Sequence, residues 1–289
     1  MSKSPVKFVD EEDTEDQSRV NQINEQNMES ETPDSNHEMN NYFQVSLPSK
    51  GKLGYPSTIE YRDVVYGDEI KIRMATNNTY IRTVNKVLKG IINNPSFYDD
   101  ICTYDRDFLL LWTFANSYTP KQEMEMDCVY CNYKNGVTVD LTELEVNDIQ
   151  DDIPVPFKME LKTGDTIYVH LPRIRDELIA DSMTQNSDNQ SLAFDDYIIQ
   201  SAIDIEGKQF KKNQEKFEWI ENNISAKEMS VIKRFHERFA FGVNDIIEKE
   251  CENCGELNRG RFPFRVENFF ASTGSDDDLE YYLQLNKES

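Results

Sequence analysis

The stretch Asp127-Cys128-Val129-Tyr130-Cys131-Asn132 decides how this sequence is interpreted, together with its counterpart Glu250-Cys251-Glu252-Asn253-Cys254-Gly255. Each stretch contains a Cys-x-x-Cys pair, and each lies where a strand-like pattern would turn back on itself. A two-residue gap lets both sulfurs of a pair point at one metal ion, and Zn²⁺ prefers four thiolates in a tetrahedron. The sequence therefore predicts one closed structural Zn²⁺ site, whose four ligands are Cys128, Cys131, Cys251 and Cys254.

Other interpretations of these cysteines stay open, namely disulfides, a redox dithiol and unrelated thiols. Disulfides are disfavoured in an intracellular protein, and a redox Cys-x-x-Cys pair usually opens a helix, whereas strand patterns flank both pairs. Between the two pairs lie 119 residues, so two separate metal sites are the alternative to a shared one. Asn132 and Gly255 are expected to offer backbone N–H groups to the sulfurs. The fifth cysteine, Cys102, is expected to be a buried core thiol.

Outward from the first pair, the pattern predicts a hairpin. Met124, Met126 and Cys128 share one strand face, Asn135-Gly136 marks a turn, and residues 137–139 form the return strand. Further strands are predicted at 42–47, 58–62, 167–171 and 262–266, and helices at 81–90, 105–115 and 226–239.

The ends of these helices have recognisable signals. Asp105 is expected to be the N-cap of the second helix, in which Phe108, Leu111, Trp112 and Ala115 form an apolar stripe. Ser225-Ala226-Lys227-Glu228 is a capping box for the third, with Gly242 as its stop and His236 solvated or half-buried. The order of strands and helices predicts an α+β fold with a zinc-ribbon-like unit rather than a doubly wound sheet.

Composition divides the chain further. Residues 1–40 hold 11 acidic and three basic residues and few large apolar ones, so we expect them to be disordered or ordered by a partner. Residues 181–191 are expected to form a polar loop. The predicted division is a disordered acidic extension (1–40), an α+β domain with the first cysteine pair (41–172), a helical insertion (173–245), the second pair with a closing strand (246–273) and an acidic tail (274–289).

The charge balance excludes several classes of function. The net charge of −23 argues against a general DNA- or RNA-coating protein and against a polybasic membrane-surface binder. No apolar run approaches the roughly 20 residues of a membrane span, and no signal peptide is recognisable, so a soluble intracellular protein is expected. The sequence has no phosphate-binding loop, dinucleotide fingerprint or nucleophile elbow, so no enzymatic activity is expected.

One segment reverses the charge. Residues 207–238 contain eight Lys or Arg and five Glu. A basic helical face beside a zinc ribbon could touch nucleic acid, or it could complement the acidic stretch 143–152 or an acidic partner protein. The total charge favours the last two. A zinc-ribbon nucleic-acid-binding or transcription-associated module therefore remains the alternative function.

Several segments of the sequence resemble the baseplate family of contractile-tail bacteriophages of the T-even type. They are Leu47-Pro48-Ser49-Lys50-Gly51, Tyr55-Pro56, Tyr104-Asp105-Arg106-Asp107-Phe108-Leu109-Leu110-Leu111, Ser117-Tyr118, the first pair with Val137-Thr138-Val139-Asp140-Leu141, the second pair, and Phe269-Phe270. The resemblance runs roughly from residue 42 to 271 and leaves out the acidic extension. It implies a non-enzymatic tail morphogenesis protein, either a structural component or an assembly factor of the baseplate hub. Its implied partners are other baseplate and tail proteins, in the host cytoplasm during assembly or in the virion baseplate.

Overall fold

The structure is a computed structural model that describes residues 42–117, 120–184, 190–262 and 283. The chain divides into two units, residues 1–40 and 41–289, and the first lies wholly outside the described residues. The expectations for the acidic extension, for the strand beyond Phe262 and for the acidic tail apart from Leu283 therefore lie outside the described residues as well.

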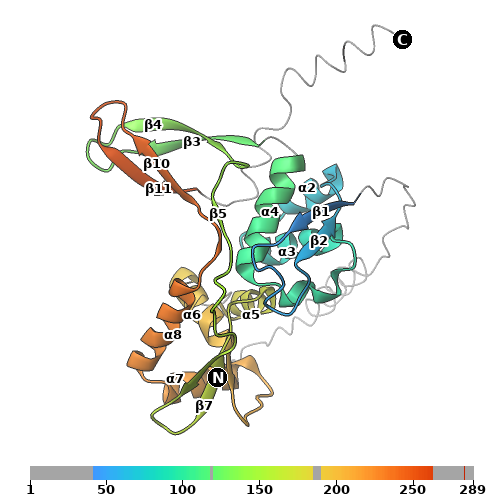
Figure 1. Cartoon of the computed structure of the whole chain (residues 1–289), viewed down its shortest axis with the longest axis vertical. Coiled ribbons are helices and arrows are strands. Elements are labelled where there is room, and N and C mark those ends of the chain that lie inside the picture. Colours follow the sequence, from blue (N-terminus) through green and yellow to red (C-terminus); the bar gives the residue numbers. More distant parts are fainter. Residues whose placement is uncertain (1–41, 118–119, 185–189, 263–282, 284–289) are drawn as a thin grey trace, which may run out of the picture. The chain divides into compact units, whose positions relative to one another are not determined.

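Short strands and helices follow one another along the described chain (Figure 1). The strands are β1 (Phe43–Ser46), β2 (Thr58–Tyr61), β3 (Lys121–Asp127), β4 (Lys134–Asp140), β5 (Val146–Asn147), β6 (Phe157–Glu160), β7 (Thr166–Val169), β8 (Ile203–Ile205), β9 (Gly242–Val243), β10 (Ile246–Glu250) and β11 (Leu257–Arg261). The helices are α2 (Tyr66–Arg73), α3 (Tyr80–Ile91), the 3₁₀ helix η1 (Pro95–Asp100), α4 (Thr103–Ser117), α5 (Ile174–Thr184), α6 (Gln190–Ser201), α7 (Asn213–Asn223) and α8 (Ala226–Arg238).

The strands pair into small antiparallel sheets. These are β1–β2, β3–β4, β5–β9, β6–β7–β8 and β10–β11. Within the described residues no two of these strands run parallel, so the chain is a mixed helix-and-strand protein and not a doubly wound sheet. None of the helices in the described part combines the length and apolar character that crossing a bilayer requires.

The predicted helices are confirmed by the residues they bury. In α3 the side chains of Val84, Val87, Leu88 and Ile91 are buried. In α4 the predicted stripe is buried at Phe108, Leu111 and Ala115, while half-buried Trp112 donates its indole N–H to the Tyr61 hydroxyl at 3.0 Å. Both helices contribute these residues to the same hydrophobic core.

The role of Asp105 differs from the predicted N-cap. Helix α4 begins at Thr103, and the Asp105 carboxylate is buried inside its first turn. It accepts hydrogen bonds from the Ser49 N–H at 3.0 Å and the Tyr55 hydroxyl at 2.5 Å. The Tyr55 oxygen in turn accepts the N–H of Cys102, which is buried as predicted. Desolvation by burial raises the pKa of Asp105, although these hydrogen bonds oppose the shift.

The capping box of α8 is confirmed, but the predicted stop at Gly242 is wrong. The Ser225 side chain accepts the Glu228 N–H, the Glu228 carboxylate accepts the Ser225 N–H, and the helix ends at Arg238. Gly242 lies in β9 with a φ of 88°, and a Cβ atom there would lie 3.1 Å from the Tyr104 carbonyl oxygen. The glycine is therefore needed for close packing of β9 against α4 and not for ending a helix.

The polar break at 181–191 is narrower than predicted. Helix α5 continues to Thr184 and α6 begins at Gln190, so only residues 185–189 lie outside the described residues. Asp181 stays within the helix because its buried carboxylate forms an ion pair with Arg82 of α3 at 2.9 Å. A long-range partner thus overrides the turn preference of the local sequence.

Among the described residues, the acidic stretch 143–152 forms ion pairs with the turn after β1 and not with the basic segment 207–238. Asp148 pairs with Lys50 at 2.5 Å, and Asp151 pairs with Lys52, both from the turn after β1. In the described part of the chain the ion pairs of the basic segment 207–238 lead to Asp165 and Asp196 instead. The basic segment therefore does not complement the acidic stretch by ion pairing.

Candidate metal centre

Two hairpins with equivalent turns build the candidate metal centre. Strands β3 and β4 pair from Lys121↔Asp140 to Asp127↔Lys134, and the residues between them form the first cysteine loop, 128–133. Strands β10 and β11 pair in the same way around the second cysteine loop, 251–256. Asn135 and Gly136 lie within β4 opposite Met126 and Glu125, so the predicted turn at these two residues is wrong. The cysteine loop itself reverses the chain.

The two cysteine loops have matching backbone hydrogen bonds. The N–H of Cys128 donates to the carbonyl five residues later at 2.8 Å, and that of Cys251 does the same at 2.9 Å. The N–H groups of Asn132 and Gly255 donate to the carbonyl oxygens of these same first cysteines, not to sulfurs as predicted. Asn132 and Gly255 also share a positive φ, 59° and 76°, which closes both loops in the left-handed region.

The loops bring the four predicted ligands together. Cys128 Sγ lies 3.6 Å from Cys254 Sγ, and Cys131 Sγ lies 3.6 Å from Cys251 Sγ. All four sulfurs lie within 4.8 Å of one another and none forms a disulfide. A tetrahedron with metal–sulfur bonds of about 2.3 Å has sulfurs about 3.8 Å apart, whereas a disulfide needs about 2.05 Å. Four cysteines at this spacing could hold one metal ion.

Two buried asparagines join the loops to each other, although the sequence predicts Asn135 only as a turn residue and does not predict Asn258 at all. The side-chain oxygen of Asn135 accepts the Glu252 N–H at 2.9 Å, and that of Asn258 accepts the Val129 N–H at 3.0 Å. Each side-chain NH₂ donates to the carbonyl two residues back in its own loop, at 3.3 Å and 3.0 Å. We call Asn135 and Asn258 the asparagine clasp, because each one holds the opposite loop.

A repeated spacing in the sequence could have revealed the clasp. Both loops fit the pattern Cys-x-x-Cys-x-x-x-Asn, with the asparagine four residues after the second cysteine. Packing adds to the hydrogen bonds: Gly260 of β11 has no side chain, and a Cβ there would lie 3.0 Å from the Cε of Met126. The hairpins therefore contact each other through protein groups besides the four cysteines.

Backbone donors tune the thiols unequally. Desolvation alone would raise the pKa of Cys128, but the N–H groups of Tyr130 and Cys131 and the Asn258 side chain lower it to about 6. The pKa of Cys251 is also lowered, because the N–H groups of Cys254 and Asn253 outweigh its desolvation. The pKa of Cys254 rises to about 12: the Glu256 N–H lowers it, but desolvation and bonds to the other thiols raise it more. The lowered pKa values of Cys128 and Cys251 favour their thiolate forms, and thiolates are what metals bind.

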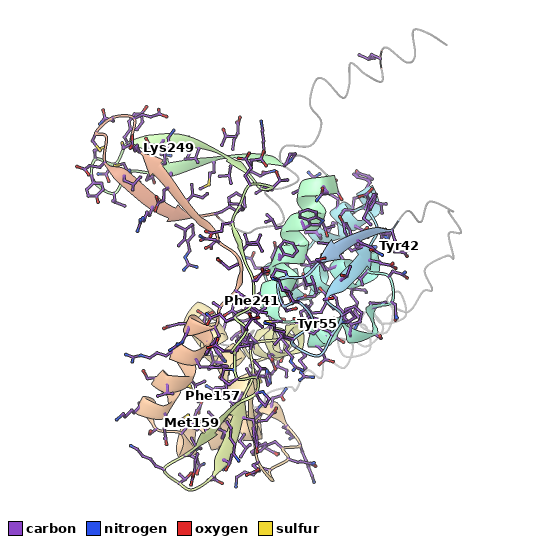
Figure 2. All side chains as sticks on the ribbon, viewed as in Figure 1. Tyr42, Tyr55, Phe157, Met159, Phe241 and Lys249 are labelled. Carbon is purple, nitrogen blue, oxygen red and sulfur yellow. The ribbon has the colours of Figure 1, made fainter. Side chains whose placement is uncertain are left out.

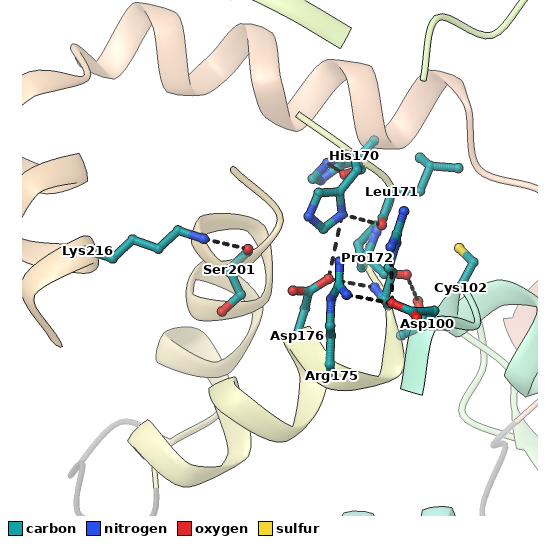
Figure 3. A network of polar contacts seen from close by, with 12 residues as sticks. Asp100, Cys102, His170, Leu171, Pro172, Arg175, Asp176, Ser201 and Lys216 are labelled. Carbon is teal, nitrogen blue, oxygen red and sulfur yellow. Dashed lines mark hydrogen bonds and ion pairs between the residues drawn. The ribbon is translucent and has the colours of Figure 1, made fainter. Parts of the chain in front are cut away.

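A second polar cluster joins the end of β7 to η1 and α5 (Figure 3). His170 Nδ1 lies 2.9 Å from the Leu171 carbonyl oxygen and 3.7 Å from Asp176, while Arg173 and Arg175 both reach Asp100 at 3.3 and 2.5 Å. Desolvation lowers the pKa of His170 and raises that of Asp176. These polar groups connect elements that are distant in the sequence, which is a structural role.

His236 of α8 is buried, contrary to the prediction of a solvated or half-buried side chain. Its Nε2 lies 3.1 Å from the His170 carbonyl oxygen, and its Nδ1 has no hydrogen-bond partner in the described structure. Desolvation lowers the pKa of His236 to about 4, so the side chain is neutral at pH 7 and its Nε2–H is the donor.

The fold and the cysteine cluster together define a class: a mixed helix-and-strand protein in which two hairpins, distant in the sequence, meet at four cysteines. A family model described as T4 bacteriophage base plate protein matches residues 39–271, and the chain belongs to that family. The match confirms the resemblance and includes both cysteine pairs and every described strand and helix. No curated protein and no solved structure matches the chain.

Proposed function

We propose that this chain acts at the hub of the phage baseplate, as a structural component or assembly factor that works by contact with other tail proteins and not by catalysis. Family membership over residues 39–271 is the observation that carries the proposal, because it already gives the chain a structural or assembly role in the baseplate. The assignment to the hub, rather than to the baseplate in general, rests on the sequence resemblance. The chain acts in the host cytoplasm during assembly. As a structural component of the hub it would also be present in the virion, whereas as an assembly factor it would not.

We further propose that one structural Zn²⁺ joins the two hairpins as a zinc-ribbon-like unit. Four soft thiolate ligands in a compact cluster suit Zn²⁺ better than Mg²⁺ or Ca²⁺, which take oxygen ligands. The ligands are Cys128, Cys131, Cys251 and Cys254. Four protein ligands fill a tetrahedron, so this zinc has no open position for a substrate and supports the architecture alone.

The proposed zinc brings together the two ends of a long segment of the chain. Each cysteine pair is local, whereas the 119 residues between the pairs include β6–β8 and helices α5–α8. Bringing the ends of so long a segment together is entropically unfavourable, and metal binding supplies free energy that offsets it. Zinc binding thereby becomes part of the folding free energy of the protein.

Elemental analysis of the purified protein tests the zinc. We expect one zinc per chain, its loss in Cys254→Ser, and its retention in the control Cys102→Ser, because Cys102 is buried elsewhere in the core. Two zinc ions per chain would mean separate sites. A folded, metal-free protein in which the four thiols of the cysteine loops titrate freely would contradict the proposal.

A phage that lacks this gene tests the assembly role. We expect it to accumulate tail intermediates without a complete hub, and we expect the purified protein to bind baseplate proteins in the presence of nuclease. Normal baseplates in the absence of the protein would contradict the proposal. The alternative, a nucleic-acid-binding module, predicts binding to DNA or RNA that weakens steeply with salt.

A further inference from the structure

The two cysteine loops share one backbone and differ in their side chains. Their hydrogen bonds, positive-φ residues and clasp asparagines match position by position. Where the second loop has Glu252, Asn253 and Glu256, the first loop has Val129, Tyr130 and Tyr133 at the equivalent positions. The second loop therefore shows that this turn forms with polar residues at all three positions.

The three apolar residues of the first loop project into solvent. Val129 is 74 % exposed, Tyr130 65 % and Tyr133 42 %. We call these three residues the apolar knuckle. Side chains with this exposure do not stabilise the loop by burial, and exposed clusters of aromatic and aliphatic residues in soluble proteins commonly mark interaction sites. Tyrosine is also among the residues that contribute most to binding at protein interfaces.

The surroundings of the apolar knuckle are acidic. The two hairpins, 121–140 and 246–261, carry eight Asp or Glu and five Lys or Arg. Lys249, labelled in Figure 2 near the end of its hairpin, is already paired with Glu252 at 3.3 Å, and Lys134 is paired with Glu125 at 3.0 Å. Four thiolates around one Zn²⁺ add further net negative charge, a point that rests on the proposed metal. A complementary surface is therefore positively charged.

We propose that the apolar knuckle docks on another baseplate protein, in an apolar pocket with a rim of Lys and Arg side chains. Val129 and Tyr130 enter the pocket, and the acidic residues of both hairpins face its basic rim. Two copies of this chain do not fit knuckle to knuckle, because both knuckles lie on hairpins with the same negative charge. A nucleic acid does not fit either, since its phosphates would face the carboxylates.

The structure suggests a variant that separates docking from folding. Val129→Glu with Tyr130→Asn gives the first loop the side chains that the second loop already has at these positions. We expect this double variant to keep one zinc per chain and a melting temperature close to that of the wild type. The matched control makes the same two exchanges at other exposed positions, Val231→Glu on α8 and Tyr42→Asn before β1.

The test is complementation of a phage that lacks this gene. Because buried aromatic anchors often contribute a factor of about 30 or more in affinity, we expect the knuckle variant to lower the yield of infective phage by about 10-fold or more. The control should restore the wild-type yield. A knuckle variant with full yield, or one that loses its zinc, would overturn the docking proposal. Normal tails without the protein would instead contradict the proposed function itself.

A photo-crosslinking residue in place of Tyr130 identifies the chemistry of the partner in infected cells. We expect crosslinks to a peptide of another tail protein that contains Lys or Arg beside apolar residues. The same residue in place of exposed Glu221 on α7 serves as the control and should not give this product. Crosslinks to a second copy of this chain, to nucleic acid, or to no tail protein would each overturn the proposal.

Discussion

Asn135 and Asn258 occupy the same place in the two cysteine loops, and each uses its side chain in the same way. A carboxamide suits this role because it accepts a hydrogen bond with its oxygen while it donates with its nitrogen. The clasp therefore holds the two loops, and with them the sulfurs, in position through hydrogen bonds of the protein itself. Preorganisation of this kind strengthens metal binding because less order has to be created on binding.

Removal of either clasp residue should weaken the metal centre. In Asn135→Ala the Glu252 N–H loses its acceptor, and in Asn258→Ala the Val129 N–H does. We expect each variant to lose about 1–3 kcal/mol of unfolding free energy and about 10- to 100-fold in zinc affinity. Urea unfolding and competition with a chromophoric chelator measure these two quantities.

Asn132→Gly is the matched control for the clasp variants. It removes an exposed asparagine from the same loop, and its φ of 59° suits glycine. We expect zinc affinity close to that of the wild type. Equal losses in Asn132→Gly and in the clasp variants would show that the crossing hydrogen bonds have no special role.

His236 makes the stability of the protein depend on pH. Its pKa is about 4 in the folded protein and about 6.5 in an unfolded chain, so between these values only the unfolded chain takes up the proton. This contribution is complete above pH 6.5 and is lost as the pH falls towards 4. Between pH 7 and 4.5 we expect His236→Gln to lose about 2–3 kcal/mol less unfolding free energy than the wild type. Urea unfolding at both pH values measures the difference, and parallel losses in both proteins would contradict it.

At the scale of the elements, a buried ion pair joins α4 to α5. Arg106 makes two hydrogen bonds of 2.7 Å to the Glu177 carboxylate, and Asn85 of α3 donates to that carboxylate at 3.0 Å. The Tyr98 hydroxyl of η1 donates to Asn85 at 3.0 Å, so four elements share one network. Such a network fixes how the helices pack, because few other arrangements satisfy all of its buried groups.

Glu177→Ala should destabilise the helical packing strongly. It removes the bidentate partner of the buried Arg106 guanidinium and leaves only the more exposed Asp107 carboxylate, at 2.7 Å, as a counter-charge. We therefore expect a loss of about 3 kcal/mol in unfolding free energy, at the lower end of the cost of breaking a buried ion pair. Asp99→Ala, which breaks the exposed pair with Lys89, is the control and should lose less than about 1 kcal/mol. Replacing both buried charges, as Arg106→Met with Glu177→Leu, should recover much of the loss. Equal effects of Glu177→Ala and Asp99→Ala would contradict this prediction.

At the scale of the whole molecule, the proposed zinc connects two hairpins that also contact each other through the asparagine clasp and through Met126 against Gly260. The helices depend less on the metal, since α3, α4 and α5 contribute many buried residues to the hydrophobic core, whereas the hairpins contribute a smaller set such as Met126, Val137 and Ile247. Loss of the metal should therefore loosen the hairpins before it unfolds the helices.

Limited proteolysis with and without a chelator measures this order of events. In the metal-free protein we expect trypsin to cut first at Lys134, Arg259 and Arg261, because these residues lie on the strands next to the cysteine loops. Far-ultraviolet circular dichroism should change little at that stage. The same cleavage sites at the same rates in both forms would contradict the prediction.

The sequence by itself determined the local features of this protein. The amphipathic stripe of α4 and the capping box at Ser225 depend on residues within a few positions of one another, and the hairpin turns depend on each Cys-x-x-Cys pair. The order of motifs along the chain likewise indicated the baseplate family. Features of this kind are encoded by short-range spacing, which a single sequence displays directly.

Only the tertiary structure decided the long-range partners. Asp105 has the sequence context of a helix cap, yet it binds Ser49 and Tyr55, which lie 56 and 50 residues away. Gly242 has the context of a helix stop, yet it allows close contact with Tyr104. The clasp likewise joins loops on either side of a 119-residue segment. A side chain with several possible partners takes the one that the packed core brings within bonding distance, and that choice depends on the whole chain at once.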